Sequence, residues 1–78
     1  MPKLPRASGD KHFSAFKAAG WQLNHIEGSH YILTKENSDI HLSVPVHKNK
    51  TLGMGLLKKL IKKAGLTNEE YLEFFNMK

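Results

Sequence analysis

The spacing of the apolar residues changes twice along the chain, and this constrains the fold more than any other feature. Over residues 8–20 apolar side chains recur three positions apart, which is typical of one face of a helix. Over residues 21–44 apolar and polar residues alternate, as they do in strands, and over residues 52–64 the helical spacing returns. The sequence therefore predicts a helix, then strands, then another helix.

Turn and cap signals mark the first helix and divide the alternating region. Ser8 or Asp10 can cap this helix, and Gly20 is placed to end it in the left-handed conformation. Turns at residues 27–29 and 36–39 separate three strands. Strands joined by such short turns form an antiparallel meander.

The alternation also assigns the two faces of the predicted sheet. His41 and Ser43 are expected to point outward, and Pro45 ends the third strand because proline cannot donate to the ladder. The side chains expected to point inward are Ile40, Leu42 and Val44, and Trp21 and Leu23 are expected to share one face of the first strand.

The second predicted helix is amphipathic and closes at Gly65. Its apolar arc is expected to hold Leu57, Leu60, Ile61 and Ala64. Its opposite arc holds Lys58, Lys59, Lys62 and Lys63. A solvated helix face explains lysines, but not the absence of acids that would form favourable pairs four residues apart. The lysine arc therefore favours an anionic partner, and nucleic acid above others.

A third, short helix is predicted near the C-terminus from its start signal. Thr67 and Glu70 have the spacing of a capping box, and Leu66 and Tyr71 that of a hydrophobic staple. Its core face is expected to carry Leu72 and Phe75, with Phe74 nearby. The predicted fold class is α+β: helix, three-stranded antiparallel sheet, helix and short C-terminal helix, with one sheet face free for a ligand.

Length and composition narrow the class of protein. With 78 residues we predict one domain over residues 1–78, in which residues 1–8 are an irregular lead-in. Without cysteine the sequence has no disulfide, no thiolate zinc site and no thiol nucleophile. No apolar run approaches the roughly 18 residues that span a bilayer, and no signal peptide is recognisable. We expect a soluble cytoplasmic protein with no membrane partner.

The positive charge is concentrated in one segment. Residues 47–63 contain six lysines and no acid, whereas charges of both signs are mixed elsewhere. Such a segment is the electrostatic footprint of a protein that binds a phosphate backbone, and it would also suit an acidic protein partner.

Four short segments, in this order and with these spacings, resemble the HicA toxin family, also called YcfA-like. They are Ala19-Gly20-Trp21, Gly28-Ser29-His30-Tyr31, Val44-Pro45-Val46-His47 and residues 55–67, and the resemblance extends over residues 8–75. It implies a fold like that of double-stranded-RNA-binding domains, a histidine-dependent ribonuclease activity on messenger RNA, and neutralisation by a HicB-like antitoxin.

Residue by residue, the resemblance places the family's functional histidine at His30 and its second recurrent histidine at His47. Two positions depart from the family pattern. Val46 stands where a basic residue is frequent, which removes a candidate phosphate contact. Leu56 replaces the threonine of a Gly-Thr-Leu triplet, which removes a hydroxyl that could cap the helix or touch RNA.

RNA cleavage demands little of a protein, because the 2′-hydroxyl is the nucleophile. A base, an acid and cations around the phosphate are enough, and imidazole takes and gives a proton near neutral pH. We therefore predict a metal-independent endoribonuclease without a cofactor, in which His30 is catalytic. Ser29 can donate a hydrogen bond to a phosphate or to His30, and His47 is either a second catalytic or phosphate-contacting group or a loop residue. The predicted RNA-binding residues are Lys48, Lys50, Lys58, Lys59, Lys62 and Lys63.

Alternatives stay open. The chain could be a non-catalytic RNA-binding module of the same fold, and its basic face could chiefly bind an acidic antitoxin. His25, His41 and His47 could gather with His30 around a metal ion, but no His-x-x-x-His spacing supports this. His12, on the first helix, is expected to face solvent.

Overall fold

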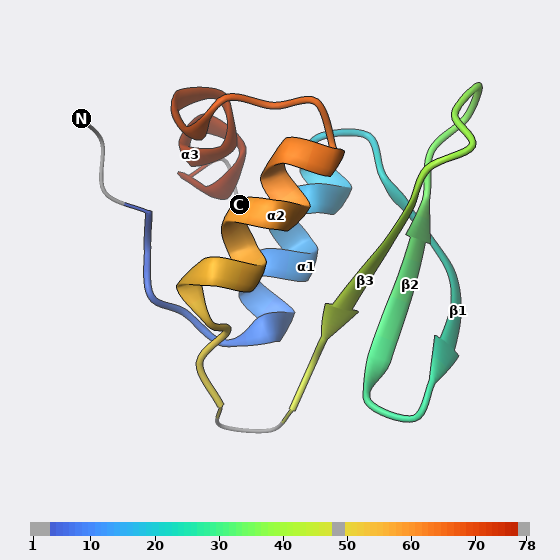
Figure 1. The fold of residues 1–78 in the computed structure, drawn as a ribbon, viewed down its shortest axis with the longest axis horizontal. Helices are drawn as coiled ribbons and strands as arrows, with labels where there is room; N and C mark the ends of the chain where they lie inside the picture. Colours follow the sequence, from blue (N-terminus) through green and yellow to red (C-terminus); the bar gives the residue numbers. More distant parts are fainter. Residues whose placement is uncertain (1–3, 48–49, 77–78) are drawn as a thin grey trace.

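A computed structural model describes residues 4–47 and 50–76, and its elements follow the predicted order. They are α1 (Gly9–Ala18), β1 (Gln22–Glu27), β2 (His30–Thr34), β3 (His41–Pro45), α2 (Met54–Lys63) and α3 (Asn68–Asn76). The strands form one antiparallel sheet in the order β1-β2-β3. The three helices lie together on one side of this sheet (Figure 1). The predicted α+β class and element order are confirmed.

The predicted helix ends are also confirmed. Gly20 after α1 and Gly65 after α2 have φ angles of 103° and 76°, in the region that glycine adopts without strain. At the start of α3 the Thr67 N–H donates to Glu70 Oε1 over 2.9 Å, and the Glu70 N–H donates to Thr67 Oγ1 over 3.1 Å. This is the capping box that the sequence predicts.

The start of α1 is tied to the segment that follows β3. Ser8 forms an isolated antiparallel bridge with Thr51, and Gly9 packs so closely that a Cβ atom there would lie 2.1 Å from the Pro45 carbonyl oxygen. Ser8 occupies the N-cap position without a side-chain bond to the backbone. Its hydroxyl instead donates to the Asp10 carboxylate, which lowers the pKa of Asp10.

The core lies between the helices and one face of the sheet. Leu33 of β2 and Leu42 and Val44 of β3 are fully buried there. Phe13 of α1 packs edge-on against Tyr31 of β2, with ring centroids 4.9 Å apart. The helices contribute the buried side chains of Ala15, Phe16, Leu57, Leu60, Ile61 and Tyr71. The predicted apolar arc of α2 is therefore confirmed.

Ile40, which is predicted to point into the core, is exposed instead, and Leu23 is exposed although it is predicted to share a face with the buried Trp21. Ile40 precedes β3 and is 43% exposed, and Leu23 in β1 is 39% exposed. Every residue of β1 is exposed, whereas β3, the other edge strand, buries Leu42 and Val44 against the helices. A register shift between Leu23 and His25 also interrupts the alternation.

The prediction for His12 is wrong. This side chain is fully buried between α1 and α3, and its Nδ1 atom hydrogen-bonds the Tyr71 hydroxyl. Tyr71 is also the fully buried residue of α3, whereas the predicted core residues Leu72 and Phe75 are only partly buried. Helix α3 packs against the side of α1 that carries His12, so this position does not face solvent.

Candidate functional site

The sheet face opposite the core carries His30, at the start of β2. In the β2–β3 register His30 lies opposite Pro45, and Ile32 lies opposite Ser43. His30 and Ser43 are therefore diagonal neighbours on the same face, within reach of each other. The His30 Nδ1 atom lies 3.3 Å from Ser43 Oγ.

His47 is brought to the same place by the chain that continues from β3. The Val46 N–H donates to the Ser29 carbonyl oxygen over 2.7 Å, which prolongs the pairing beyond the strands. The ring centroids of His47 and His30 are then 6.5 Å apart, with the rings at 79°. Both side chains are exposed. Gly28 allows the tight turn beside them, because its φ is 58° at the first position of a two-residue hairpin.

This spacing lets both imidazoles reach one anionic group. Hydrogen bonds from ring nitrogens to oxygen span about 2.7–3.2 Å, so an atom group lying over the space between His30 and His47 can contact both rings. Each ring can also take or give a proton. Two imidazoles, a side chain that can act as a base or as an acid, therefore lie at one exposed position.

No hydrogen bond joins the Ser29 hydroxyl to His30 in the described residues, and its predicted contact with a phosphate stays a prediction. Within residues 4–47 and 50–76 its hydroxyl makes no hydrogen bond, and only its backbone carbonyl is engaged. The hydroxyl that contacts His30 belongs to Ser43, which the sequence places only on the outward face. Whether Ser43 lies next to His30 depends on the register between β2 and β3, and no signal in the sequence predicts that register.

The remaining histidines on the sheet do not join the pair. His25 lies in β1, where its Nε2 is 3.1 Å from Glu27 Oε1 and its Nδ1 is 2.6 Å from Asn24 Oδ1. His41 is exposed at the far end of β3, opposite Thr34. The described residues contain no group of three or more His, Asp or Glu side chains that could hold a metal ion.

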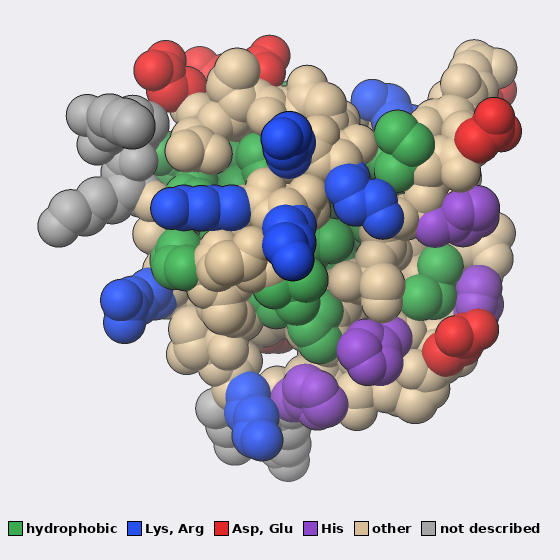
Figure 2. Space-filling view, in the orientation of Figure 1, with side chains coloured by type: hydrophobic (Ala, Val, Ile, Leu, Met, Phe, Trp, Pro, Cys, Tyr) green, Lys and Arg blue, Asp and Glu red, His purple; other side chains and the backbone are tan. Residues whose placement is uncertain are grey.

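The lysines of α2 all face solvent. Lys58, Lys59, Lys62 and Lys63 are exposed, and in the part of the chain that the structure describes none of them pairs with a carboxylate. Figure 2 shows lysine side chains over α2 and histidine side chains over the sheet on the same face of the molecule. Basic and imidazole groups therefore share one surface.

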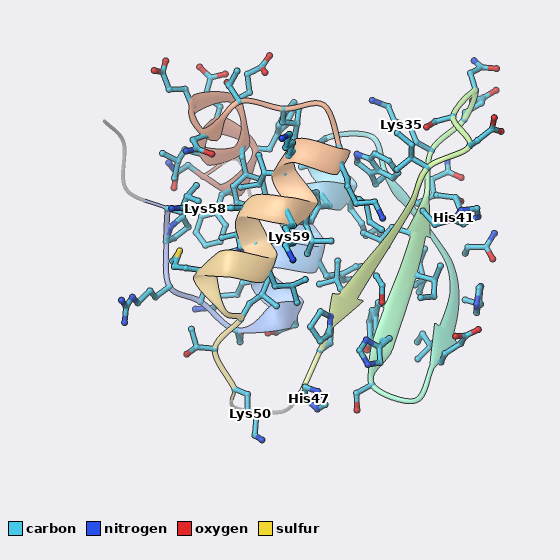
Figure 3. The ribbon with its side chains drawn as sticks, in the orientation of Figure 1. Lys35, His41, His47, Lys50, Lys58 and Lys59 are labelled. Atoms are coloured by element: carbon cyan, nitrogen blue, oxygen red, sulfur yellow. The ribbon has the colours of Figure 1, made fainter. Side chains whose placement is uncertain are left out.

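The labelled side chains in Figure 3 show how this surface is arranged. His47 and Lys50 lie at the same end of the molecule, in the connection between β3 and α2. Lys59 projects over the middle of α2, whereas Lys58 extends from the side of the helix away from the sheet. Lys48, the remaining predicted contact, lies outside the described residues.

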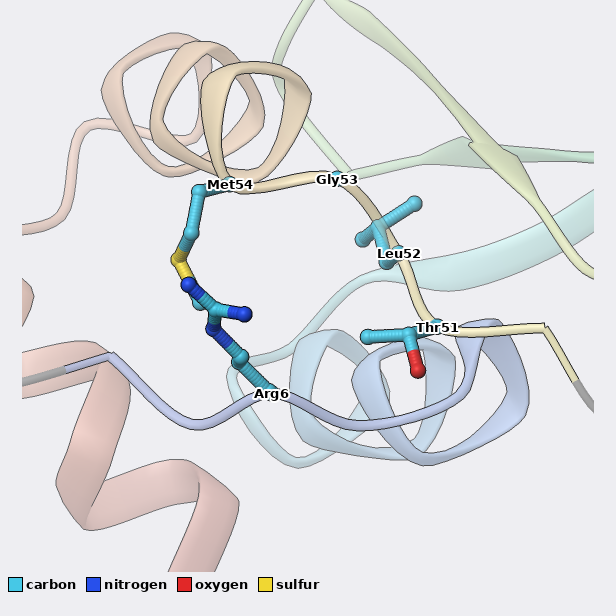
Figure 4. Close-up of a pocket in the computed structure, with 5 residues that line it drawn as sticks. All are labelled: Arg6, Thr51, Leu52, Gly53 and Met54. Atoms are coloured by element: carbon cyan, nitrogen blue, oxygen red, sulfur yellow. The ribbon is translucent and has the colours of Figure 1, made fainter.

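A pocket of about 290 Å³ opens at the N-terminal end of α2 (Figure 4). It is lined by Arg6, Thr51, Leu52, Gly53 and Met54. The sequence predicts no functional residue among these, and none of the predicted catalytic residues lines the pocket. The histidine pair is thus a surface site.

The fold and the site together define a small α+β protein with a basic, histidine-bearing face. In the described residues no helix is both long enough and apolar enough to cross a membrane. The sequence model of a protein family, the HicA toxin of bacterial toxin–antitoxin systems, matches residues 9–66 of the chain. These residues include α1, the sheet, α2 and both histidines of the pair. The chain therefore belongs to the HicA toxin family. None of the curated proteins matches it. Membership of a toxin–antitoxin family implies an antitoxin partner.

Proposed function

We propose that this member of the HicA toxin family is an endoribonuclease that cleaves messenger RNA in the cytoplasm without a metal ion. His30 is the catalytic acid–base residue, and His47 is the second group at the phosphate. The observation that carries the proposal is the pair of exposed imidazoles with ring centroids 6.5 Å apart, on the face that also bears the lysines of α2 (Figure 2).

The proposed reaction uses the 2′-hydroxyl of RNA as its nucleophile. One imidazole removes the 2′-hydroxyl proton, and the 2′-oxygen bonds to phosphorus while the bond from phosphorus to the 5′-oxygen breaks. The other imidazole gives its proton to the departing 5′-oxygen. The products are a 2′,3′-cyclic phosphate and a 5′-hydroxyl end, and lysines stabilise the charge that gathers on the phosphate.

RNA is proposed to lie across the histidine pair and α2. Exposed lysines without carboxylate partners contribute to phosphate binding mainly by releasing counterions, so affinity should fall steeply with salt. The likeness to double-stranded-RNA-binding domains, which the family resemblance implies, suggests that shape rather than sequence is recognised. The proposed contacts are Lys48, Lys50, Lys58, Lys59, Lys62 and Lys63.

The test is cleavage of a defined RNA by the purified protein in the presence of EDTA. Wild type should release a 2′,3′-cyclic phosphate, and an RNA with a 2′-deoxy sugar at the cleaved position should stay intact. His30→Ala should abolish both cleavage and growth arrest while its circular dichroism stays unchanged. Full cleavage by His30→Ala, or loss of wild-type cleavage in EDTA, would overturn the proposal.

A second candidate function is that of an RNA-binding module without catalysis. It is favoured by the position of Glu27, which lies opposite His30 in the β1–β2 register but has its carboxylate bonded to His25. No carboxylate among the described residues therefore orients His30. RNA that is bound with a steep salt dependence but recovered intact would favour this candidate.

The antitoxin partner is proposed to be HicB-like and to present acidic groups to this face. Attraction between an acidic surface and the lysines of α2 would speed association, and a partner seated there would cover the histidine pair. Expression from the native operon should yield a complex with a small partner protein, and that complex should not cleave RNA.

A further inference from the structure

We propose that Ser43 is a positioning residue that holds the ring of His30 through Nδ1, so that Nε2 is the nitrogen that exchanges protons with RNA. This inference rests on the proposed function and adds to it a residue that acts through His30. The hydrogen bond between His30 Nδ1 and Ser43 Oγ, at 3.3 Å, is its starting point.

Both residues stand on paired strands, which fixes their separation. His30 begins β2, and Ser43 lies in the middle of β3, opposite Ile32. The adjacent residue Val44 is fully buried, as is Leu42 on the other side of Ser43. Packing of these two side chains holds the Ser43 backbone in place, and sites built on strands are positioned more precisely than sites on loops.

The contact assigns different tasks to the two ring nitrogens. In the protonated ring, Nδ1–H donates to Ser43 Oγ and the Nε2 proton is available for the leaving oxygen. In the neutral ring, Nδ1–H keeps the same partner and Nε2 offers a lone pair to the 2′-hydroxyl. The Ser43 hydroxyl can accept from Nδ1–H or donate to a bare Nδ1, so the contact itself holds the orientation of the ring. The proposal adds that Nδ1 carries the proton, which leaves Nε2 to serve in whichever of the two roles His30 takes.

Ser43 takes a place that a carboxylate fills in many histidine sites. Glu27 is the acidic residue opposite His30 in the β1–β2 register, but its Oε1 atom is 3.1 Å from His25 Nε2. The His30 ring hydrogen-bonds no other described side chain besides Ser43. A carboxylate at this place would repel the phosphate of bound RNA. A hydroxyl holds the ring without adding that negative charge.

Nuclear magnetic resonance of the ring nitrogens tests the positioning without any activity assay. In 15N-labelled wild type above neutral pH, the His30 signals should show a proton on Nδ1 and none on Nε2. Ser43→Ala should shift His30 toward a mixture of tautomers, and Ser43→Thr, which keeps a hydroxyl, should restore the wild-type pattern. Thr34→Ala, which removes a hydroxyl from β2 opposite His41, is the control and should change nothing. Unchanged His30 tautomers in Ser43→Ala would overturn the inference.

Cleavage kinetics supply the second readout. Ser43→Ala should lower kcat about 10-fold with KM for RNA unchanged, and Ser43→Thr should recover most of the loss. Full kcat in Ser43→Ala overturns the positioning role alone. If wild type does not cleave RNA, the proposed function fails, and the catalytic part of this inference fails with it whatever the tautomer.

Discussion

The Tyr71 hydroxyl of α3 hydrogen-bonds the Nδ1 atom of His12 of α1 inside the core. Both side chains are fully buried, and their rings stack with centroids 5.8 Å apart. Because α3 follows the family-matched residues 9–66, this bond ties the matched region to a helix outside it. Burial raises the pKa of Tyr71 above its ordinary value of 10.0.

Tyr71→Phe should therefore lower the free energy of unfolding by about 1–3 kcal/mol at neutral pH, because a buried hydrogen bond is lost. Wild type should in addition lose stability above about pH 10, where the unfolded tyrosine ionises while the folded one is held neutral. The gap in free energy of unfolding between wild type and Tyr71→Phe should thus narrow as the pH rises.

Urea unfolding at a series of pH values measures this gap. Tyr31→Phe is the control, because no described residue hydrogen-bonds that hydroxyl, and it should cost less at neutral pH. A gap that stays constant between pH 7 and pH 11 would contradict the prediction that buried Tyr71 resists ionisation.

Gly9→Ala should destabilise the protein and weaken RNA cleavage together. The new Cβ would lie 2.1 Å from the Pro45 carbonyl oxygen and 3.0 Å from Val46 Cα, so the backbone leading to His47 must shift. We expect a loss of about 1–3 kcal/mol and a lower kcat.

Gly55→Ala is the matched control, since nothing lies within 4 Å of its added Cβ. Alanine there should stabilise α2 by up to about 1 kcal/mol and leave the approach to His47 as it is. Thermal unfolding and single-turnover cleavage of both variants check the prediction. Equal stability and kcat for Gly9→Ala and wild type would show that the contact with Pro45 is not restrictive.

Lys59→Ala should weaken RNA binding more than Lys58→Ala. The two exposed lysines are neighbours on α2, but Lys58 extends away from the sheet (Figure 3). Loss of one phosphate contact should reduce the slope of log K against log salt by about 1. Titration of a short RNA at several salt concentrations measures the slope for each variant. A larger loss of RNA binding in Lys58→Ala than in Lys59→Ala would place the RNA on the other side of α2.

Most of the fold could be predicted from the sequence because local signals determine it. The change of apolar period set the element order, Gly20 and Gly65 set two helix ends, and Thr67 with Glu70 set the third helix start. Each of these signals acts through neighbours along the chain, so no knowledge of packing was needed.

The errors arose where distant parts of the chain meet. His12 occupies a helix position that looked polar, but α3 covers it and Tyr71 supplies a partner. Leu23 shares a face with Trp21 in the alternating pattern, but every residue of its strand is exposed, whereas the helices cover β3 at the other edge of the sheet. In the candidate site the motif singles out His30, whose catalytic role stays a prediction, whereas the contact of His30 with Ser43 depends on strand register.

His47→Ala should distinguish a second catalytic group from a phosphate contact. If His47 exchanges a proton during cleavage, its removal should lower kcat by about 10²–10⁴-fold and turn a bell-shaped pH dependence of kcat into a curve with one limb. Loss of a phosphate contact alone would instead raise KM and leave the shape of the curve unchanged. The matched control is His41→Ala, which removes another exposed imidazole, at the far end of β3, opposite Thr34 and outside the pair. Because the ring centroids of His30 and His47 are 6.5 Å apart and His30→Ala alone should already abolish cleavage, the single variant His47→Ala is the informative one. Unchanged kcat and KM in His47→Ala would contradict both roles.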